Sequence, residues 1–403
     1  MDETMTSGRH FLQIPGPTNV PERVRLAMDR SVPDHRGWEM PELTSELVRG
    51  LRQVFKTTSG RIALYPGSGT AAWEASIVNT LEPGDRVLAF SIGHFSHLYA
   101  ECGRRLGMAV DEVELPWTRG VPPELVEAHL SVDRAHRYRA VLVVHNETST
   151  GATSDVGAIR AAMDAAGHPA LLLVDSVSGV ASMDFRFDEW GVDVALTGAQ
   201  KGLMLPPGMG ILCLGPRALE RSRHVTTPRY FLDWGPLLEQ METGYFPYTP
   251  ATLHLLGLRE ALRMLLEEGL EAVFARHARL AGAVRGAVEA WGLEILCQCP
   301  AERSNTLTAV VVPPEVDADH VLRFAQTRLN LSLGTGLGRL RKRVFRIGHL
   351  GALNELEVLA TLAGVELALH LSGVPLDLGS GVAAAQRLLA ETLRTRAGAT
   401  TPC

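Results

Sequence analysis

The chain has 403 residues, of which 46% are apolar and 21% charged, and its formal net charge is −6. Because one hydrophobic core seldom grows beyond about 250–300 residues, this length predicts a globular protein of two domains. An acidic balance without a long basic run argues against binding to nucleic acid or to an anionic membrane surface.

The N-terminal stretch "MDETMTSGRHFLQIPGP" carries early acids and no apolar run long enough for a signal peptide. No segment approaches the roughly 20 uninterrupted apolar residues of a transmembrane helix. The five cysteines are scattered, and the Cys297-Gln-Cys299 pair lacks a second pair that would complete a zinc site. We therefore expect a cytoplasmic protein with no bound metal.

From residue 61 onward, short apolar runs alternate with longer amphipathic stretches. The runs expected to be strands are "RIALYP", "DRVLAFS", "AVDEVEL", "RAVLVV", "ALLLVDS", "VDVALTG" and "GMGILCLG". Helical patterns such as "HLYAECGRRLG" and "VGAIRAAMDAAGH" lie between them. This alternation predicts an α/β fold whose mostly parallel sheet is covered by helices on both faces.

The C-terminal part has a different pattern. Helical periodicity continues for about forty residues from "LHLLGLREALRM" to "GAVEAWGL", and this stretch should span the junction between the domains. Strand-like runs ("TLTAVVV", "RVFRIG") and helical ones ("DHVLRFAQTRL", "ELEVLATLAGVELALHL") follow. We expect an N-terminal arm (1–24), a large domain (25–268) and a smaller α+β domain (269–403).

The turn "PGSGTAAWE" follows a predicted strand and opens a predicted helix. Free backbone N–H groups and the helix dipole converge at such a turn, and Ser68 and Thr70 add hydroxyls. The turn therefore favours an anion, most plausibly a phosphate, although a tight connection is the alternative. Its spacing matches neither the dinucleotide fingerprint nor the P-loop.

Two charged residues end neighbouring apolar runs. Asp175 follows "LLLV", and Lys201 follows "VDVALTGAQ". A buried carboxylate needs a cationic or donor partner, and a desolvated lysine has a lowered pKa and can attack an aldehyde. A structural ion pair is the alternative. With the phosphate turn, the pair suits pyridoxal phosphate, which has a phosphate, a ring nitrogen and an aldehyde.

Seven ordered motifs strengthen this interpretation: "IPGPTNVP", "PGSGTAAWE", "VVHNETSTG", "LLVDSVSG", "TGAQKGLMLPPG", "GYFPYTP" and "VFRIGHLG". Together they resemble the class V pyridoxal-phosphate aminotransferases over almost the whole chain, and within them the bacterial serine–glyoxylate enzymes and their alanine– and aspartate–glyoxylate kin. The resemblance implies the fold-type I architecture, a homodimer with sites at the subunit interface, and pyridoxal 5'-phosphate as cofactor.

The resemblance also implies roles for single residues. Lys201 matches the lysine that forms the Schiff base and later moves the substrate proton, and Asp175 matches the partner of the pyridine nitrogen. The other positions that match cofactor contacts are Ser68, Gly69 and Thr70 at the phosphate, Phe95 and Val177 on the ring, Thr148 near the phenolic oxygen, Gln200 at the phosphate and Thr249 across the dimer interface. Taken alone, Phe95 would be read as a core aromatic and Thr148 as a turn former.

Substrate contacts follow in the same way. Arg346 matches the arginine that binds the α-carboxylate, for which a planar guanidinium is well shaped. Gly16 would let the N-terminal arm approach the substrate closely. In "DHRGWEM" we hypothesise that His35 or Arg36 lies near the mouth of the site and helps to select the amino donor; a surface loop is the alternative.

The implied reaction is ping-pong transamination of glyoxylate to glycine with L-serine as donor, which leaves hydroxypyruvate. Aspartate or alanine as donor, and a non-catalytic binding protein on the same fold, are the alternatives.

Two positions depart from the family pattern. Phe246 stands where a tyrosine is common, so that Tyr245 or Tyr248 would supply the hydroxyl, and Ala199 stands where serine is common. The sequence leaves the donor, assembly beyond a dimer and the direction of the reaction open.

Overall fold

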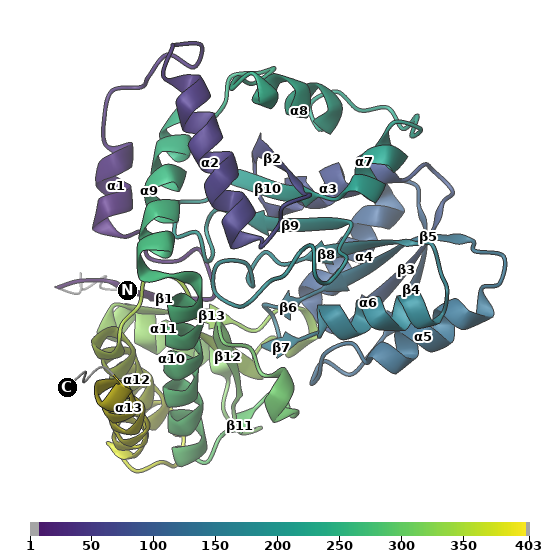
Figure 1. Cartoon of the computed structure of the whole chain (residues 1–403). Coiled ribbons are helices and arrows are strands. Elements are labelled where there is room, and N and C mark those ends of the chain that lie inside the picture. The colour runs from purple at the N-terminus through teal and green to yellow at the C-terminus, as the bar shows by residue number, and fades with distance from the viewer. Residues whose placement is uncertain (1–7, 400–403) are drawn as a thin grey trace.

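The computed structural model describes residues 8–399, with side chains to residue 394, so the first seven residues of the predicted arm and Cys403 lie outside it. Its centre is a seven-stranded sheet (Figure 1). In spatial order the strands are β2 (Arg61–Pro66), β10 (Met209–Leu214), β9 (Val194–Gly198), β8 (Leu171–Asp175), β5 (Tyr138–Val144), β3 (Arg86–Ser91) and β4 (Ala109–Glu114). Only β10 runs antiparallel to its neighbours, so the expected mostly parallel sheet is confirmed.

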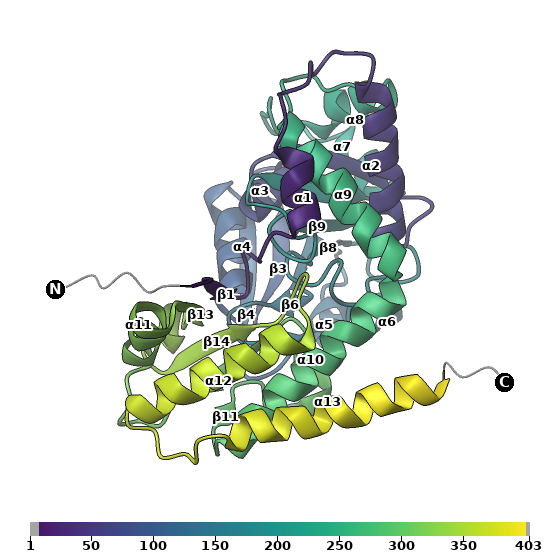
Figure 2. The same ribbon diagram turned by 90° about the vertical axis from the view of Figure 1, so that its left-hand side faces the viewer.

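Helices cover both faces of this sheet. Figures 1 and 2 show α3 and α4 on one face and α2 and α6 on the other. The helices of this part are α1 (Glu22–Met28), α2 (Met40–Val54), α3 (Gly69–Thr80), α4 (His94–Arg105), α5 (Pro123–Val132), α6 (Val156–Ala165), α7 (Pro216–Ser222), α8 (Trp234–Glu242) and α9 (Thr252–Glu268). Because both faces are covered, β8, β9 and β10 are buried along their whole length.

A second, five-stranded sheet lies beside the first. Its spatial order is β1 (Phe11–Gln13), β13 (Leu331–Thr335), β14 (Val344–Gly348), β12 (Leu307–Val311) and β11 (Glu294–Ile295). The accompanying helices are α10 (Leu270–Ala290), α11 (Ala318–Leu329), α12 (Glu355–Leu371) and α13 (Ser380–Ala399), with short 3₁₀ turns η1 (Pro300–Glu302) and η2 (Gly338–Leu340). A two-stranded hairpin, β6 (Asn146–Glu147) and β7 (Ala152–Thr153), completes the fold. The five-stranded sheet and α10–α13 form the smaller α+β unit that the sequence predicted.

The N-terminal strand belongs to this second sheet. β1 pairs in parallel with β13, with Phe11 opposite Leu331, and α1 packs on α9. The chain therefore crosses from the smaller sheet to the larger part within its first thirty residues. The polypeptide between β1 and α1 passes directly over the C-terminal side of β9, where it contacts Lys201.

The long helical stretch of the sequence is divided into two helices. α9 ends at Glu268 and α10 begins at Leu270, with Gly269 between them at a φ of +84°. This left-handed conformation favours glycine and ends the first helix. The apolar periodicity continues across the break because α10 passes from one core to the other.

Among the described residues, three clusters of buried apolar side chains make up the interior. The first runs from Val24 to Val273, the second from Leu280 to Leu389, and a small third one lies between Leu296 and Val344. The predicted boundaries at 24/25 and 268/269 stay predictions, although the second falls at Gly269 and the first lies inside α1. In the described part of the chain, no helix is both long and apolar enough to span a membrane.

Candidate active site

The site is built where β8 and β9 end side by side. The two strands are parallel, with Asp175 opposite Leu196, so their carboxyl ends share one edge of the sheet. Asp175 is the last residue of β8, and Lys201 follows the end of β9 by three residues. Open α/β sheets bind ligands at this edge.

Asp175 is a buried acid held by two donors. Its exposed fraction is 4%. Trp73 Nε1 donates to Oδ2 over 2.8 Å, and the Val177 backbone N–H donates to Oδ1 over 2.7 Å. Burial nevertheless raises the pKa of Asp175 to about 6, and the nearby Lys201 opposes this shift. A cationic partner at this carboxylate would favour its ionised form further and lower this pKa.

Lys201 lies against the polypeptide that follows β1. Its Nζ donates to the Pro15 carbonyl, and Thr18 Oγ1 donates to the Lys201 carbonyl over 3.3 Å. Burial, and next the positive charge of Arg346, lower its pKa to about 8, whereas Asp175 acts in the opposite direction. The neutral amine, which a nucleophile requires, is therefore far more populated near physiological pH than for an ordinary lysine, although the ammonium form still predominates.

Gly16 leaves the space that the lysine occupies. A Cβ on Gly16 would stand 2.5 Å from Lys201 Cδ and 2.7 Å from its Nζ. The residue also adopts a φ of +95°, which favours glycine. The predicted close approach of the N-terminal arm is thus toward Lys201 itself.

The predicted phosphate turn opens α3. Ser68 is the N-cap residue, and its Oγ accepts from the Thr70 N–H over 3.2 Å. A Cβ on Gly69 would lie 2.8 Å from Val177 Cγ2, so the turn packs against the residue that follows Asp175. On the other side, Gln200 has a buried Oε1 with no hydrogen-bond partner among the described residues. Free N–H groups, hydroxyls and an amide are suitable ligands for a phosphate.

Arg346 extends from β14 of the smaller sheet to the larger part. It is 7% exposed, its Nε donates to the Thr335 carbonyl over 2.9 Å, and its Nη1 donates to the Thr148 carbonyl over 2.7 Å. Burial lowers its pKa to about 10, so the guanidinium stays cationic at neutral pH. The guanidinium has further donors that neither carbonyl uses, and these can bind a carboxylate.

Thr148 and Phe95 lie on segments adjoining these groups. Thr148 Oγ1 is 2.7 Å from Ser178 Oγ, in the turn after β8. Phe95 is in the first turn of α4 and is half-buried, and its backbone N–H donates to Glu147 Oε1 over 3.2 Å. Phe95 is predicted to contact the ring and Thr148 the phenolic oxygen. Their two segments are joined by the hydrogen bond from the Phe95 N–H to Glu147, the residue before Thr148.

Two predicted residues, His35 and Arg36, are not brought to this site within one chain, and a third, Thr249, lies at the surface. His35 and Arg36 lie in the loop between α1 and α2, at the top of Figure 1, whereas β1 and β13 lie below the larger sheet. Arg36 and Thr249 are exposed. Of the two tyrosines near Phe246, Tyr248 donates its hydroxyl to the Leu64 carbonyl over 2.9 Å.

Several residues of the site were missed in the sequence. The Trp73 side chain holds Asp175, Glu147 holds the start of α4, and the Pro15 carbonyl accepts from Lys201. The sequence did hold a signal for Trp73, because this residue stands one helical turn after Gly69 and therefore lies on the same face of α3. The sequence held no such signal for Glu147, since three of its four donors are backbone N–H groups that no side-chain pattern reveals.

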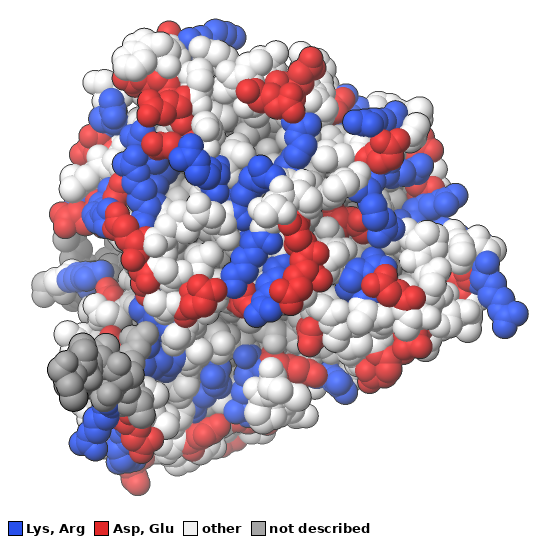
Figure 3. Space-filling view, viewed as in Figure 1, with Lys and Arg blue, Asp and Glu red and all other residues white. Residues whose placement is uncertain are grey.

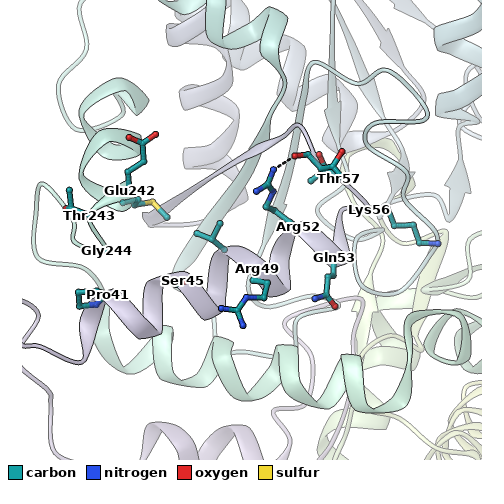
Figure 4. Close-up of a pocket in the computed structure, with 13 residues that line it drawn as sticks. Pro41, Ser45, Arg49, Arg52, Gln53, Lys56, Thr57, Glu242, Thr243 and Gly244 are labelled. Atoms are coloured by element: carbon teal, nitrogen blue, oxygen red, sulfur yellow. Dashed lines mark hydrogen bonds between the residues drawn. The ribbon is translucent and has the colours of Figure 1, made fainter.

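A hollow of about 800 Å³ on another face is not the site. It lies along α2 (Figure 4), and the charges around it are mixed (Figure 3). Two of the cations that line it already have partners: Arg52 donates to the Thr58 carbonyl, and Lys56 pairs with Asp184 and Glu271. Within the described residues, no group of three or more His, Cys, Asp or Glu side chains could hold a metal ion.

The residues at the sheet edge fit a phosphorylated aromatic aldehyde. The buried acid with a raised pKa suits a ring nitrogen, the lysine with a lowered pKa suits the aldehyde, and the glycine-rich turn that opens α3, with its free N–H groups and hydroxyls, suits the phosphate. With a guanidinium for a carboxylate beside them, the fold and the site define a pyridoxal-phosphate-dependent aminotransferase.

Comparison with known proteins identifies the family. The model of the class V aminotransferases matches residues 11–339, and the chain belongs to this family. It is 50% identical to the serine–glyoxylate aminotransferase of Arabidopsis thaliana, with 96% of this chain and 97% of the relative covered. It is 49% identical to that of Methylorubrum extorquens (97% and 98% covered) and 46% identical to the L-aspartate–glyoxylate aminotransferase of Paracoccus denitrificans (94% and 96%).

Solved structures agree with this assignment. The ureidoglycine–glyoxylate aminotransferase of Bacillus subtilis superposes with a TM-score of 0.88 at 27% identity, with 96% of this chain and 100% of that chain covered. The predicted class, fold and cofactor are therefore confirmed, since class V aminotransferases use pyridoxal phosphate. Which residue plays which role remains a prediction.

Proposed function

We propose that the protein transfers the amino group of L-serine to glyoxylate, giving hydroxypyruvate and glycine. The observation that carries the proposal is the convergence of Lys201, Asp175 and Arg346 on one buried edge of the sheet. The serine–glyoxylate enzymes among the relatives support serine as donor. The aspartate–glyoxylate relative makes aspartate the second candidate.

Bound pyridoxal phosphate supplies an aldehyde that takes up the amino group and a ring that stabilises negative charge at the substrate α-carbon. Lys201 Nζ would hold the aldehyde and then carry the proton of the α-carbon. The Asp175 carboxylate would keep a proton on the ring nitrogen. Trp73 and the Val177 N–H orient that carboxylate.

The phosphate would be held by Ser68, Gly69, Thr70 and Gln200, and the ring would lie between Phe95 and Val177. Thr148 Oγ1 would donate toward the phenolic oxygen. Arg346 would bind the α-carboxylate that serine, glyoxylate and glycine all carry, so that one clamp serves both half-reactions of a ping-pong cycle. Its bonds to the Thr335 and Thr148 carbonyls fix the direction of the guanidinium.

We also propose that the protein works as a homodimer in the cytoplasm, with Thr249 of one protomer reaching the phosphate held by the other. The exposure of Thr249 supports this. Trp38 and Tyr230 are 82% and 97% exposed, and a protomer that covered them would bury apolar surface. The four described cysteines are free, as a reducing compartment favours. His35 and Arg36 would come near a site only across such an interface.

The test is a donor panel. Serine, aspartate, alanine and glutamate are each supplied with glyoxylate, and glycine is measured. We expect the highest kcat/KM with serine and none with Lys201→Ala. A preference for aspartate would replace the proposed donor but keep the reaction class, whereas glycine formation by Lys201→Ala at the wild-type rate would contradict the proposed chemistry.

A further inference from the structure

The segment Glu147–Ser149 contacts three of the elements that the proposed chemistry uses. The Thr148 carbonyl accepts from Arg346, and Thr148 Oγ1 meets Ser178 in the turn after β8. Ser149 Oγ accepts from the His94 N–H over 2.9 Å at the start of α4. One short segment thus joins the substrate arginine, the Asp175 turn and the helix that carries Phe95.

Within this segment Glu147 is a fully buried carboxylate. Its Oε2 accepts from the Ser96 N–H over 2.8 Å. Its Oε1 accepts from the N–H groups of Phe95 (3.2 Å) and Ser149 (3.0 Å) and from Ser149 Oγ (2.7 Å). Four donors compensate the burial of the charge, and two of them are N–H groups of the first turn of α4, where the helix dipole also favours an anion.

The opposing backbone is shaped around this carboxylate. A Cβ on Gly93 would stand 2.3 Å from Glu147 Cγ and 2.4 Å from its Cδ. The φ of Gly93 is 176°, which any residue adopts, so the glycine is required here for space and not for conformation. The segments "GHFS" and "NETS" therefore fit together only with a glycine at 93 and a side chain of glutamate length at 147.

We propose that Glu147 is a positioning residue of the transamination: its carboxylate fixes the first turn of α4, and with it the ring of Phe95, relative to the segment that orients Arg346. The inference rests on the proposed function in one respect, namely that Phe95 lies on the cofactor ring. Both oxygens of Glu147 accept from protein donors, and no described contact joins Glu147 to Lys201 or Asp175.

The test replaces Glu147 by glutamine. Glu147→Gln keeps the shape but turns an NH₂ group toward backbone N–H donors, so the first turn of α4 loses part of its anchor. We expect the cofactor to dissociate about tenfold more readily and its visible circular dichroism to change, since the ring beside it is displaced. Gly93→Ala should cause the same two changes by pushing on Glu147 from the other side, and it serves as the second variant if the first does not fold.

Glu366→Gln is the matched control. Glu366 is also buried, and it accepts from Trp291 Nε1 (2.8 Å) and the Gly381 N–H (2.9 Å) in the second core, far along the chain from the site. It should lower thermal stability while cofactor affinity and circular dichroism stay as in the wild type. A merely structural role of Glu147 would make the two glutamine variants alike.

Two results would overturn the proposal. Glu147→Gln or Gly93→Ala could bind the cofactor with wild-type affinity and an unchanged spectrum, or Glu366→Gln could alter both as strongly. If instead the wild-type protein bound no pyridoxal phosphate, the proposed function would fail as well. A wild-type protein that binds the cofactor but prefers another donor would leave the role of Glu147 intact.

Discussion

At the scale of the single residue, the site depends on burial acting in opposite directions on an acid and an amine. Burial raises the pKa of Asp175 to about 6 and lowers that of Lys201 to about 8. The lysine is neutral above its pKa, so about 9% of it is neutral at pH 7 and about 90% at pH 9. The rate at which the apoprotein takes up pyridoxal phosphate, followed by visible absorbance, should therefore rise about tenfold between these pH values and then level off.

Two variants should move this pH profile in opposite directions. Arg346→Gln removes a cation that disfavours the ammonium form, so the pKa of Lys201 and the midpoint should rise. Asp175→Asn removes the anion that favours the ammonium form, so the midpoint should fall. Shifts in the same direction would contradict the electrostatic account, and Lys201→Ala should lack the titrating step altogether.

Arg346 allows a second test at this scale. Arg346→Lys keeps a cation but loses the planar fork, and one ammonium cannot serve the Thr335 and Thr148 carbonyls and a carboxylate together. We expect KM for serine and for glyoxylate to rise together, about 10- to 100-fold, with cofactor binding little changed. A rise for only one of the two substrates would show that they do not share this clamp.

At the scale of the element, the buried strands were predictable and the N-terminal elements were not. Runs such as "LLLV" before Asp175 are continuous because both faces of β8 are covered. β1 has three residues, too few to show a period, and it pairs with β13 more than three hundred positions away. The break at Gly269 was hidden because α9 and α10 both continue the same apolar periodicity.

The same contrast holds within the site. Lys201, Asp175 and the phosphate turn could be found because each stands at the end of a strand or the start of a helix, where chemistry gathers in this fold. The Pro15 carbonyl and the backbone donors around Glu147 could not, because they depend on tertiary approach of main chain. Sequence reasoning pointed to the groups that are proposed to react and missed the groups that hold them.

The chain between β1 and α1 provides a prediction for this scale. Gly16→Ala would strain a left-handed residue and also push the Lys201 side chain, since the new Cβ falls within 3 Å of it. Gly84→Ala is the control: Gly84 has nearly the same φ, +91° against +95°, and a Cβ there meets nothing within 4 Å. Both should lose about 1–2 kcal/mol of stability in thermal unfolding. Only Gly16→Ala should lower kcat/KM, on the order of 100-fold; equal activity of the two variants would contradict the contact.

At the scale of the whole molecule, one chain builds most of a site but leaves Thr249 at the surface. The loops between α1 and α2 and between α7 and α8, which carry Trp38 and Tyr230, lie along the upper edge of Figure 1. If this part of the surface meets a second copy, each site would contain residues from two chains, and sedimentation should give a dimer. The activity of a dimer built from two different variants should then depend on which substitution each protomer carries.

Hybrid dimers test this arrangement directly. Lys201→Ala and Thr249→Asp are each expected to be nearly inactive, the second because a carboxylate repels the phosphate. In a hybrid, one site would combine both changes, while the other would have an intact Lys201 and a Thr249 supplied by the other protomer. Random pairing of equal amounts makes half of the dimers hybrids, so about a quarter of the wild-type activity should return. If Thr249 served the site of its own chain, no site in the mixture would be intact, and the activity would stay at the level of the separate variants.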